Sequence, residues 1–248
     1  MPRYDFSSHR LFVTHPLTPG ASIALTREQA NYLVSVLRLQ EGDGLLIFNG
    51  SDGEWRARLH GGTRKAPLLE CLGQVRPQPP AGDLWLVFAP LKSARLDYMV
   101  QKAVEMGASR LVPVITRRTQ VARVNLARMQ ANAMEAAEQC GILAVPEVAA
   151  ESRLDQVLAQ WPAGRTLVFC DEDAESDDPL AALAGLGRDA PKALLIGPEG
   201  GFDPTERDLL SRVPGCVRLS LGPRILRADT AAVAALALVQ AVAGDMCA

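Results

Sequence analysis

From Asp83 onward, the sequence alternates short apolar runs with helical segments, and this alternation constrains the fold more than any other feature. The apolar runs are LWLVFA, LVPVI, TLVFC, ALLIG and VRLSL, and segments with helical periodicity, such as residues 93–106 and 125–140, lie between them. Strands that alternate with helices usually form a mostly parallel sheet with helices on both faces. The sequence therefore predicts an α/β fold for this part of the chain.

A second domain precedes the α/β part. The stretch VRPQPPAGD, residues 75–83, contains three prolines and a glycine and is typical of a stiff connector. Before it lie short β-like runs, RLFV, LLIF and the alternating EWRARLH, with the turn NGSDG and one helix that Thr26 caps. We therefore predict a small β-barrel domain over residues 1–76 and an α/β domain over residues 82–246.

Composition limits the class of protein. Apolar residues make up 48% of the 248 residues and charged residues 22%, as in an ordinary globular protein. No signal-peptide pattern is apparent, and the five cysteines are scattered without a Cys-x-x-Cys pair. We expect a cytoplasmic protein without a metal site. The apolar segment 230–243 is shorter than the roughly 20 residues that span a bilayer, which favours burial in the core or against a partner chain.

Charge is segregated along the chain. Residues 92–128 hold eight basic and two acidic residues, whereas residues 129–190 hold three basic and twelve acidic ones. One positive face beside an acidic one is compatible with a nucleic-acid partner. Charge alone favours the alternative of two solvated helix faces that differ in sign by chance. The basic residues that we expect at an RNA surface are Arg10, Arg38, Arg56, Arg58, Lys92, Lys102, Arg117 and Arg118.

The stretch LLIGPEGGFDPTERDLL, residues 194–210, predicts a loop at the carboxyl end of a strand, followed by a helix that Asp203 caps. Ligands bind at this edge of open α/β sheets, and glycines let the backbone approach them closely. The loop lacks the Gly-Lys-Ser/Thr of phosphate loops, and Glu199 in its middle would repel an anion. The loop therefore suits a neutral or cationic ligand, or is a tight turn without one.

The stretch LSLGPRILRADTAA, residues 219–232, is a second glycine-bearing loop after a strand. Ile225 and Leu226 lie between two arginines, where a surface loop is normally polar, so the apolar pair needs cover from another loop or a flat ligand. Asp229 and Thr230 are typical of a helix cap. Two such loops in one half of a domain favour a ligand pocket over two unrelated helix entries.

These two motifs, LLIGPEGGFDPTE and LSLGPRILRADTA, closely resemble the signature of the RsmE family of bacterial methyltransferases, which methylate N3 of a uridine in 16S ribosomal RNA. The resemblance extends over nearly the whole chain, through RLFV, VLRLQEGD, IFNGSDGEW, KSARLDYMVQKAVEMGASRLVPV and EAAEQCG. It implies a PUA-like RNA-binding barrel followed by a SPOUT domain with a deep trefoil knot, in which Ile225 and Leu226 lie at the crossing. It also implies a homodimer with the final helix at the interface, and the assembled small ribosomal subunit as partner.

S-adenosylmethionine (SAM) is the cofactor that the resemblance implies. Its sulfonium cation suits a loop that contains Glu199 and free carbonyl groups. The residues that would hold SAM are Leu195, Ile196, Gly197, Pro198, Glu199, Gly200, Gly201, Leu219, Leu221, Gly222, Ile225, Leu226 and Arg227.

Methyl transfer to uridine N3 requires a proton acceptor and a cation for the developing imide anion. We expect Arg227 to be that cation, with Arg118 contributed by a second subunit. Glu138, Glu199 and Asp229 are the candidate acceptors. Two alternatives stay open: Arg227 in a salt bridge with Asp229 or Glu199, and Asp229 as a helix cap.

Two other functions are open at the level of sequence. One is a SPOUT methyltransferase for another RNA base or a ribose, and the other is a non-catalytic RNA-binding homologue. The sequence also departs from the family pattern, because Ile142 stands in place of an arginine, Tyr32 in place of a histidine, and Ala228-Asp229 in place of Thr-Glu. These departures leave both predicted SAM loops intact.

Overall fold

The computed structural model describes residues 5, 8–63, 66–121, 123–174 and 178–247. The chain divides into two compact units, which are described separately. The N-terminal unit comprises Met1–Pro80 with Ala137–Val145, and the C-terminal unit comprises Ala81–Ala136 with Pro146–Ala248. The division at Pro80 falls in the proline-rich stretch. The sequence did not predict that residues 137–145 belong to the first unit.

The N-terminal unit contains a five-stranded sheet in the order β1-β3-β4-β5-β2. Its strands are β1 (Arg10–Phe12), β2 (Ser22–Ala24), β3 (Gly44–Phe48), β4 (Glu54–Thr63) and β5 (Ala66–Arg76). All neighbours pair antiparallel except β1 and β3. The turn NGSDG joins β3 to β4, as the sequence predicts. Side chains of β4 alternate between buried and exposed over its first half, which is the expected pattern of a strand with one face on a core.

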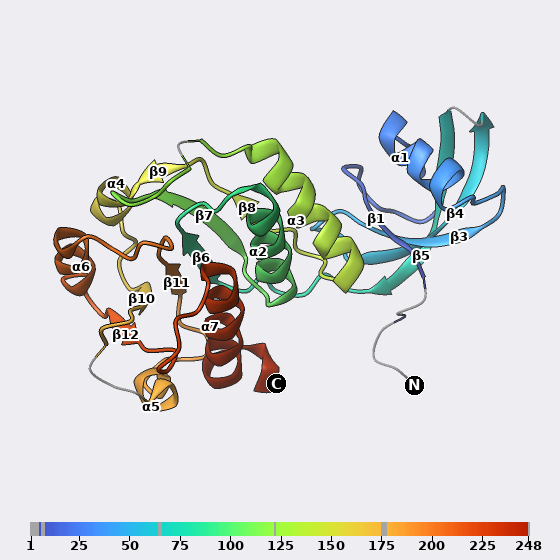
Figure 1. Cartoon of the computed structure of the whole chain (residues 1–248). Helices are drawn as coiled ribbons and strands as arrows, with labels where there is room; N and C mark the ends of the chain where they lie inside the picture. Colours follow the sequence, from blue (N-terminus) through green and yellow to red (C-terminus); the bar gives the residue numbers. More distant parts are fainter. Residues whose placement is uncertain (1–4, 6–7, 64–65, 122, 175–177, 248) are drawn as a thin grey trace. The chain divides into compact units, whose positions relative to one another are not determined.

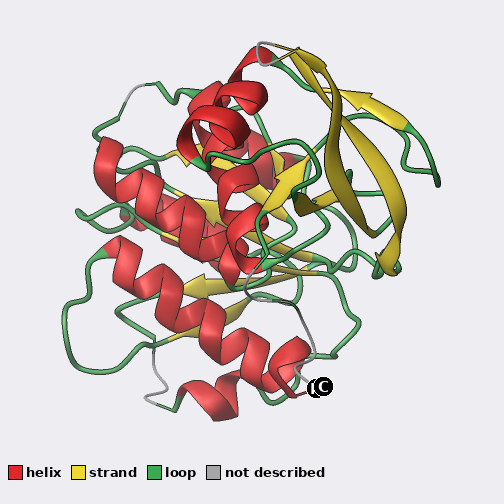
Figure 2. Ribbon diagram, turned by 90° about the vertical axis from the view of Figure 1, so that its right-hand side faces the viewer, coloured by secondary structure: helices red, strands yellow, loops and turns green. Residues whose placement is uncertain are grey.

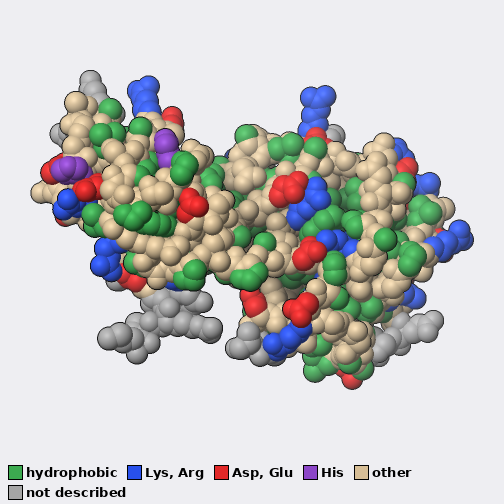
Figure 3. Space-filling model, turned by 180° about the vertical axis from the view of Figure 1, so that it is seen from behind, with side chains coloured by type: hydrophobic (Ala, Val, Ile, Leu, Met, Phe, Trp, Pro, Cys, Tyr) green, Lys and Arg blue, Asp and Glu red, His purple; other side chains and the backbone are tan. Residues whose placement is uncertain are grey.

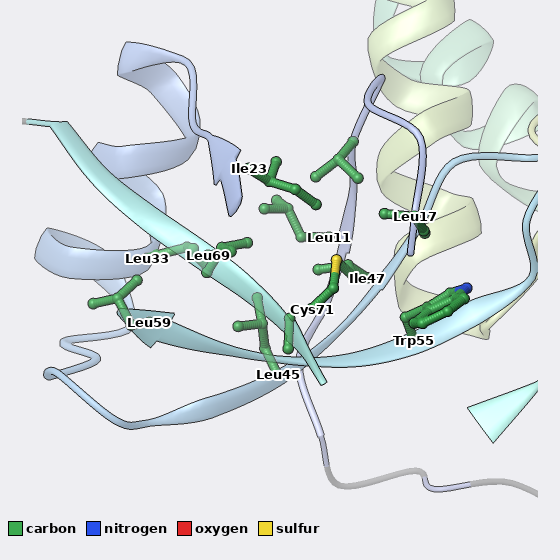
Figure 4. Packing of buried hydrophobic residues seen from close by; sticks show 12 residues of the cluster. Leu11, Leu17, Ile23, Leu33, Leu45, Ile47, Trp55, Leu59, Leu69 and Cys71 are labelled. Atoms are coloured by element: carbon green, nitrogen blue, oxygen red, sulfur yellow. The ribbon is translucent and has the colours of Figure 1, made fainter. Parts of the chain in front are cut away.

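One apolar core fills this unit. Leu11, Ile23, Ile47, Leu69 and Cys71 come from four different strands and point toward one another (Figure 4). The predicted helix begins as α1 (Arg27–Asn31), where Thr26 and Gln29 form a capping box. It continues as a π-helical turn, Tyr32–Val36, so the regular helix is shorter than the sequence predicts.

The C-terminal unit is a parallel sheet with helices on both faces (Figures 1 and 2). The strand order is β12-β10-β11-β6-β7-β8, and β9 also pairs with β7. The bounds are β6 (Leu84–Phe88), β7 (Arg110–Ile115), β8 (Glu147–Val148), β9 (Ser152–Arg153), β10 (Thr166–Cys170), β11 (Lys192–Ile196) and β12 (Val217–Leu219). This confirms the predicted α/β fold.

Helices α2 (Ser93–Glu105) and α7 (Ala228–Ala243) lie side by side on one face of the sheet, and α4 (Leu154–Ala159) and α6 (Pro204–Ser211) lie together on the other (Figure 1). The remaining helices are α3 (Leu126–Cys140), α5 (Pro179–Leu183) and a short 3₁₀ turn, Asp245–Cys247. Adjacent residues of β11 face opposite sides, and Ala193 and Leu195 belong to the core that α4 and α6 cover. No helix among the described residues is long and apolar enough to cross a membrane.

Candidate functional site

Two glycine-bearing loops leave the carboxyl edge of the parallel sheet. Residues 197–203 follow β11, and residues 220–227 follow β12 and lead into α7. Both strands pair in parallel with β10, one on each side, so the loops start on either side of that strand. This is the edge at which open α/β sheets bind ligands.

The first loop is packed tightly at two of its glycines. A Cβ atom on Gly197 would lie 2.6 Å from the ring of Phe202. Gly201 has φ of +69°, and a Cβ there would lie 3.0 Å from a carboxylate oxygen of Glu172. A Cβ on Gly200 would meet only the Arg118 side chain, at an ordinary 3.6 Å. Glycine is therefore required by the fold at 197 and 201, whereas position 200 has room.

The second loop exposes its apolar residue. Ile225 is fully exposed (101%), and Leu226 is half-buried. Of the two alternatives for covering this pair, another loop of the chain does not cover Ile225 among the described residues, and the flat ligand stays a prediction. The loop reverses direction at Gly222, whose φ is +89° and whose N–H donates to the Ser220 hydroxyl at 3.3 Å. An uncovered isoleucine at a ligand-binding edge leaves an apolar surface for a flat ligand or a second chain.

Arg95 joins the two loops. It lies in the first turn of α2, and its Nη1 is 3.3 Å from a Glu199 oxygen, while its Nε is 3.2 Å from an Asp229 oxygen. Its Nη2 is buried without a hydrogen-bond partner among the described residues. In the sequence, Arg95 contributes to the basic segment 92–128 but belongs to neither glycine motif. The available signal was a cation in the first turn of the helix that follows the carboxyl end of β6.

The loop after β7 supports the glycine loop from the other side. Arg118 donates to the Gly200 carbonyl at 2.7 Å, and Arg117 forms an ion pair with Asp203 at 3.0 Å. Two hydrogen bonds from Thr205 and the nearby arginines lower the pKa of Asp203, which caps α6 as predicted. Arg118 thus contacts the glycine loop of its own chain, and its contribution from a second subunit stays a prediction.

Arg227 is exposed, and among the described residues it has no ion pair or side-chain hydrogen bond. The alternative of a salt bridge from Arg227 to Asp229 or Glu199 is therefore wrong, because Arg95 binds both carboxylates. Asp229 is not a helix cap either. Helix α7 begins at Ala228 with Arg227 in the cap position, so Asp229 lies inside the first turn.

Glu138 is not among the side chains that these loops bring together. It belongs to the N-terminal unit, where its carboxylate accepts a hydrogen bond from the Phe12 N–H at 2.8 Å. Other predicted site residues reach the loops only through their backbone, because their side chains are buried. These residues are Leu195, Ile196 and Leu219.

A charged network fixes the end of β10 beside the first loop. Asp171 is buried and binds Arg207 at 2.8 Å and Arg218 at 2.7 Å. Arg207 also binds Glu172, the residue that faces Gly201. The network therefore links β10, α6 and β12 around the glycine loop. Sequence reasoning did not identify these residues, because the acidic run at 171–173 has no recognisable motif.

The predicted RNA-contacting residues differ in exposure and in whether an acidic side chain already binds them. The expectation that Arg10 contacts RNA is wrong. Arg10 is buried and binds Glu54 at 2.9 Å, so it is not available to a phosphate group. Ion pairs also engage Arg58 with Glu70 and Lys102 with Glu105. The exposed predicted cations without an ion pair among the described residues are Arg38, Arg56, Lys92 and Arg118.

The face seen in Figure 3 shows basic and acidic side chains interspersed, without a single basic patch. Among the residues that the structure describes, no cluster of three or more His, Cys, Asp or Glu side chains could hold a metal ion.

Comparisons with known proteins agree with this architecture. Residues 77–240 match the model of an RNA methyltransferase domain, and residues 25–70 match that of an RNA methyltransferase PUA domain. The chain is 34% identical to ribosomal RNA small subunit methyltransferase E of Synechocystis sp., over 95% of this chain and 78% of that protein. It is 28% identical to the protein of the same name from Rickettsia conorii, over 94% and 95% of the two chains.

Two solved structures share the fold. One is ribosomal RNA small subunit methyltransferase E of Neisseria gonorrhoeae bound to S-adenosyl methionine, with 26% identity and a TM-score of 0.85, covering 95% of this chain and 98% of that one. The other is a putative methyltransferase of Legionella pneumophila in complex with SAM, with 30% identity and a TM-score of 0.83, covering 96% and 98%.

Proposed function

The chain belongs to the ribosomal RNA small subunit methyltransferase E family, and from this premise we propose that it transfers a methyl group from SAM to N3 of a uridine in 16S ribosomal RNA. The observation that carries the proposal is the pair of glycine-bearing loops joined by Arg95 at the carboxyl edge of the sheet. Relatives with the same fold bind SAM.

The residues at this edge fit SAM. The glycines at 197 and 201 fix the shape of the first loop, because the fold requires glycine at both positions. The exposed Ile225 offers an apolar surface to the adenine, and the free Nη2 of Arg95 offers a donor to a polar group of the cofactor. Glu199 supplies a negative charge near the sulfonium. When bound, SAM supplies an electrophilic methyl group.

The protein's own task is to prepare the uridine. N3 carries a proton and becomes nucleophilic when that proton leaves, so the imide anion needs a nearby cation. We assign this role to Arg227, because neither Glu199 nor Asp229 neutralises it. The proton acceptor is Glu199 or Asp229, both of which lie at the loops. The bond of Glu138 to Phe12 favours a structural role for that residue.

We further propose that the loops at residues 197–203 and 220–227 form a trefoil knot, and that the protein is a cytoplasmic homodimer that acts on the small ribosomal subunit. Support for the dimer comes from α7. Ala235, Leu236 and Val239 are buried within the chain, whereas Ala234 and Leu238 on another face are only half-buried. The proposed RNA-binding surface of the PUA-like unit includes Arg38 and Arg56.

Transfer of labelled methyl groups tests the function. Purified protein is incubated with methyl-labelled SAM and small subunits from a strain that lacks the activity. We expect label in 16S ribosomal RNA, and we expect Arg227→Ala to lose most of the transfer rate while titration calorimetry shows that SAM still binds. Absence of label in RNA with the wild-type protein, despite SAM binding, would contradict the proposal.

A further inference from the structure

A hollow of about 400 Å³ lies where the first turns of α2 and α3 meet the end of β6 and the loop after β7. Its apolar lining consists of Leu91, Leu96, Val121, Val124 and Met129. Three of these side chains, Leu91, Leu96 and Met129, are buried, so the floor is part of the folded core. Lys92, Arg123 and Asn125 stand among the polar residues of the rim.

The hollow is built on segments that also contact the two glycine-bearing loops. Leu96 lines it, while Arg95, the preceding residue on α2, binds Glu199 and Asp229. Val121 lines it from the segment after β7 whose Arg118 donates to the Gly200 carbonyl. Leu96 and Arg95 are neighbours on α2, and a full helical turn rises only about 5.4 Å, so the two side chains start from nearly the same level of the helix. The hollow and the proposed cofactor loops therefore share two of their supporting segments.

The rim carries uncommitted positive charge. Arg128 is neutralised by Asp97, with its Nε 3.0 Å from an Asp97 oxygen, and Asn132 also donates to Asp97 at 2.7 Å. Lys92 and Arg123 are exposed, and neither has an ion pair or side-chain hydrogen bond among the described residues. Such cations are available to phosphate groups without breaking an existing pair.

The rim also holds a directed donor. The side-chain oxygen of Asn125 accepts the Arg128 N–H at 3.0 Å, at the start of α3. This bond orients the amide and leaves its NH₂ group to donate elsewhere. A uracil ring presents carbonyl oxygens on both sides of N3, and these accept hydrogen bonds. An apolar floor, an amide donor and two free cations together match the base, the base edge and the phosphates of one nucleotide.

We propose that this hollow receives the target nucleotide, with the base on the apolar floor, Asn125 on a carbonyl oxygen, and Lys92 and Arg123 on the adjacent phosphates. The inference rests on the proposed function, because it names the place of the substrate beside the same loops. N3 lies on the pairing edge of uracil, so a protein reaches it only when the base is unpaired and turned out. A hollow of this size is within the roughly 300–1,000 Å³ of ligand pockets.

A double-mutant cycle between protein and RNA tests the placement of the base. Val124→Phe fills the hollow, and small subunits are reconstituted with either the target uridine or an abasic ribose at that position. Dissociation constants are measured in the presence of S-adenosylhomocysteine, so that no transfer occurs. We expect base removal to weaken binding to the wild type about tenfold, and to weaken binding to Val124→Phe much less, because the ring already occupies the hollow.

Matched controls separate this effect from damage to the fold. Leu209→Phe adds a ring on the exposed side of α6 and should keep the wild-type response to base removal. SAM affinity by titration calorimetry reports whether the loops are intact. If Val124→Phe does not fold, Val121→Phe fills the same hollow. An equal loss on base removal in the wild type and the filled variant would overturn the placement of the base.

Charge removal tests the phosphate contacts. Lys92→Gln and Arg123→Gln should each weaken binding to intact subunits about tenfold and lower the salt dependence by about one unit. Arg212→Gln removes an exposed cation at the C-terminal end of α6 and should change neither the affinity for intact subunits nor its salt dependence. Unchanged salt slopes for Lys92→Gln and Arg123→Gln would overturn the phosphate assignment. A wild-type protein that methylates no small-subunit RNA would instead refute the proposed function itself.

Discussion

Arg95→Met should loosen both proposed SAM loops at once. The substitution keeps an unbranched side chain but removes the guanidinium that lies 3.3 Å from Glu199 and 3.2 Å from Asp229. Glu199 of the first loop and Asp229 of the first turn of α7, which follows the second loop, then lose their shared positive partner. Because like charges repel and both groups prefer water, we expect the loops to move apart.

The structure sets the size of the effect. The exposed fractions of the side chains are 30% for Arg95, 40% for Glu199 and 14% for Asp229. Exposed ion pairs contribute roughly 0.2–1 kcal/mol, whereas breaking a buried pair costs about 3–5 kcal/mol. The two ion pairs of Arg95 are intermediate in exposure between these cases, so we expect the variant to lose about 2 kcal/mol of stability. For a domain of this size, this corresponds to a fall in Tm of roughly 4–8 °C.

Calorimetry of unfolding and of SAM binding measures both consequences. We expect SAM affinity to fall at least about tenfold, because the cofactor must then also restore the loop positions. Arg95→Lys, which reaches one carboxylate at a time, should recover part of the loss. Arg153→Met is the control, since its exposed pair with Asp155 is local to the start of α4. Wild-type SAM affinity in Arg95→Met would refute the claim that this residue positions the site.

Three further outcomes are expected. Gly201→Val should abolish SAM binding in calorimetry with the circular dichroism spectrum retained, because φ is +69° there, whereas Gly200→Ala should bind SAM normally. Arg56→Ala should lower the salt slope of RNA binding by about one unit, and an unchanged slope would remove the proposed barrel surface. Leu238→Glu should yield a monomer with reduced methylation in light scattering and activity assays, whereas Ala235→Glu should unfold the chain, since Ala235 is fully buried; a fully active monomer would contradict a shared site.

Regular elements of this protein are readable from sequence because their signals are local. The apolar run at residues 193–196 predicts the strand β11. Asp203, Pro204 and a glutamate three residues after the cap predict where α6 begins. The same holds for the antiparallel β3 and β4, which a short glycine-containing turn connects. Local patterns of two to ten residues determine these elements, and the sequence therefore predicts them.

The site is harder to predict because its bonds join residues far apart in the chain. Arg95 and Asp229 are separated by 134 positions, and no local pattern links them. The same limit explains the wrong expectation that Arg10 lies at an RNA surface, because its partner Glu54 is 44 residues away and no local pattern links the two. Ile225 is a different case. The sequence predicts that another loop or a flat ligand covers this residue, and the described part of a single chain does not cover it.

Identification of the modified base tests the central claim most directly. Small-subunit RNA is isolated from a strain in which the gene is deleted and from the same strain carrying the wild-type gene or the Arg227→Ala gene, and its nucleosides are analysed by mass spectrometry and mapped to position. We predict that one 3-methyluridine in 16S ribosomal RNA is lost on deletion, returns with the wild-type gene and stays absent with Arg227→Ala. A methyl group that returns on a ribose or on another base, or a 3-methyluridine that persists in the deletion strain, would contradict the account.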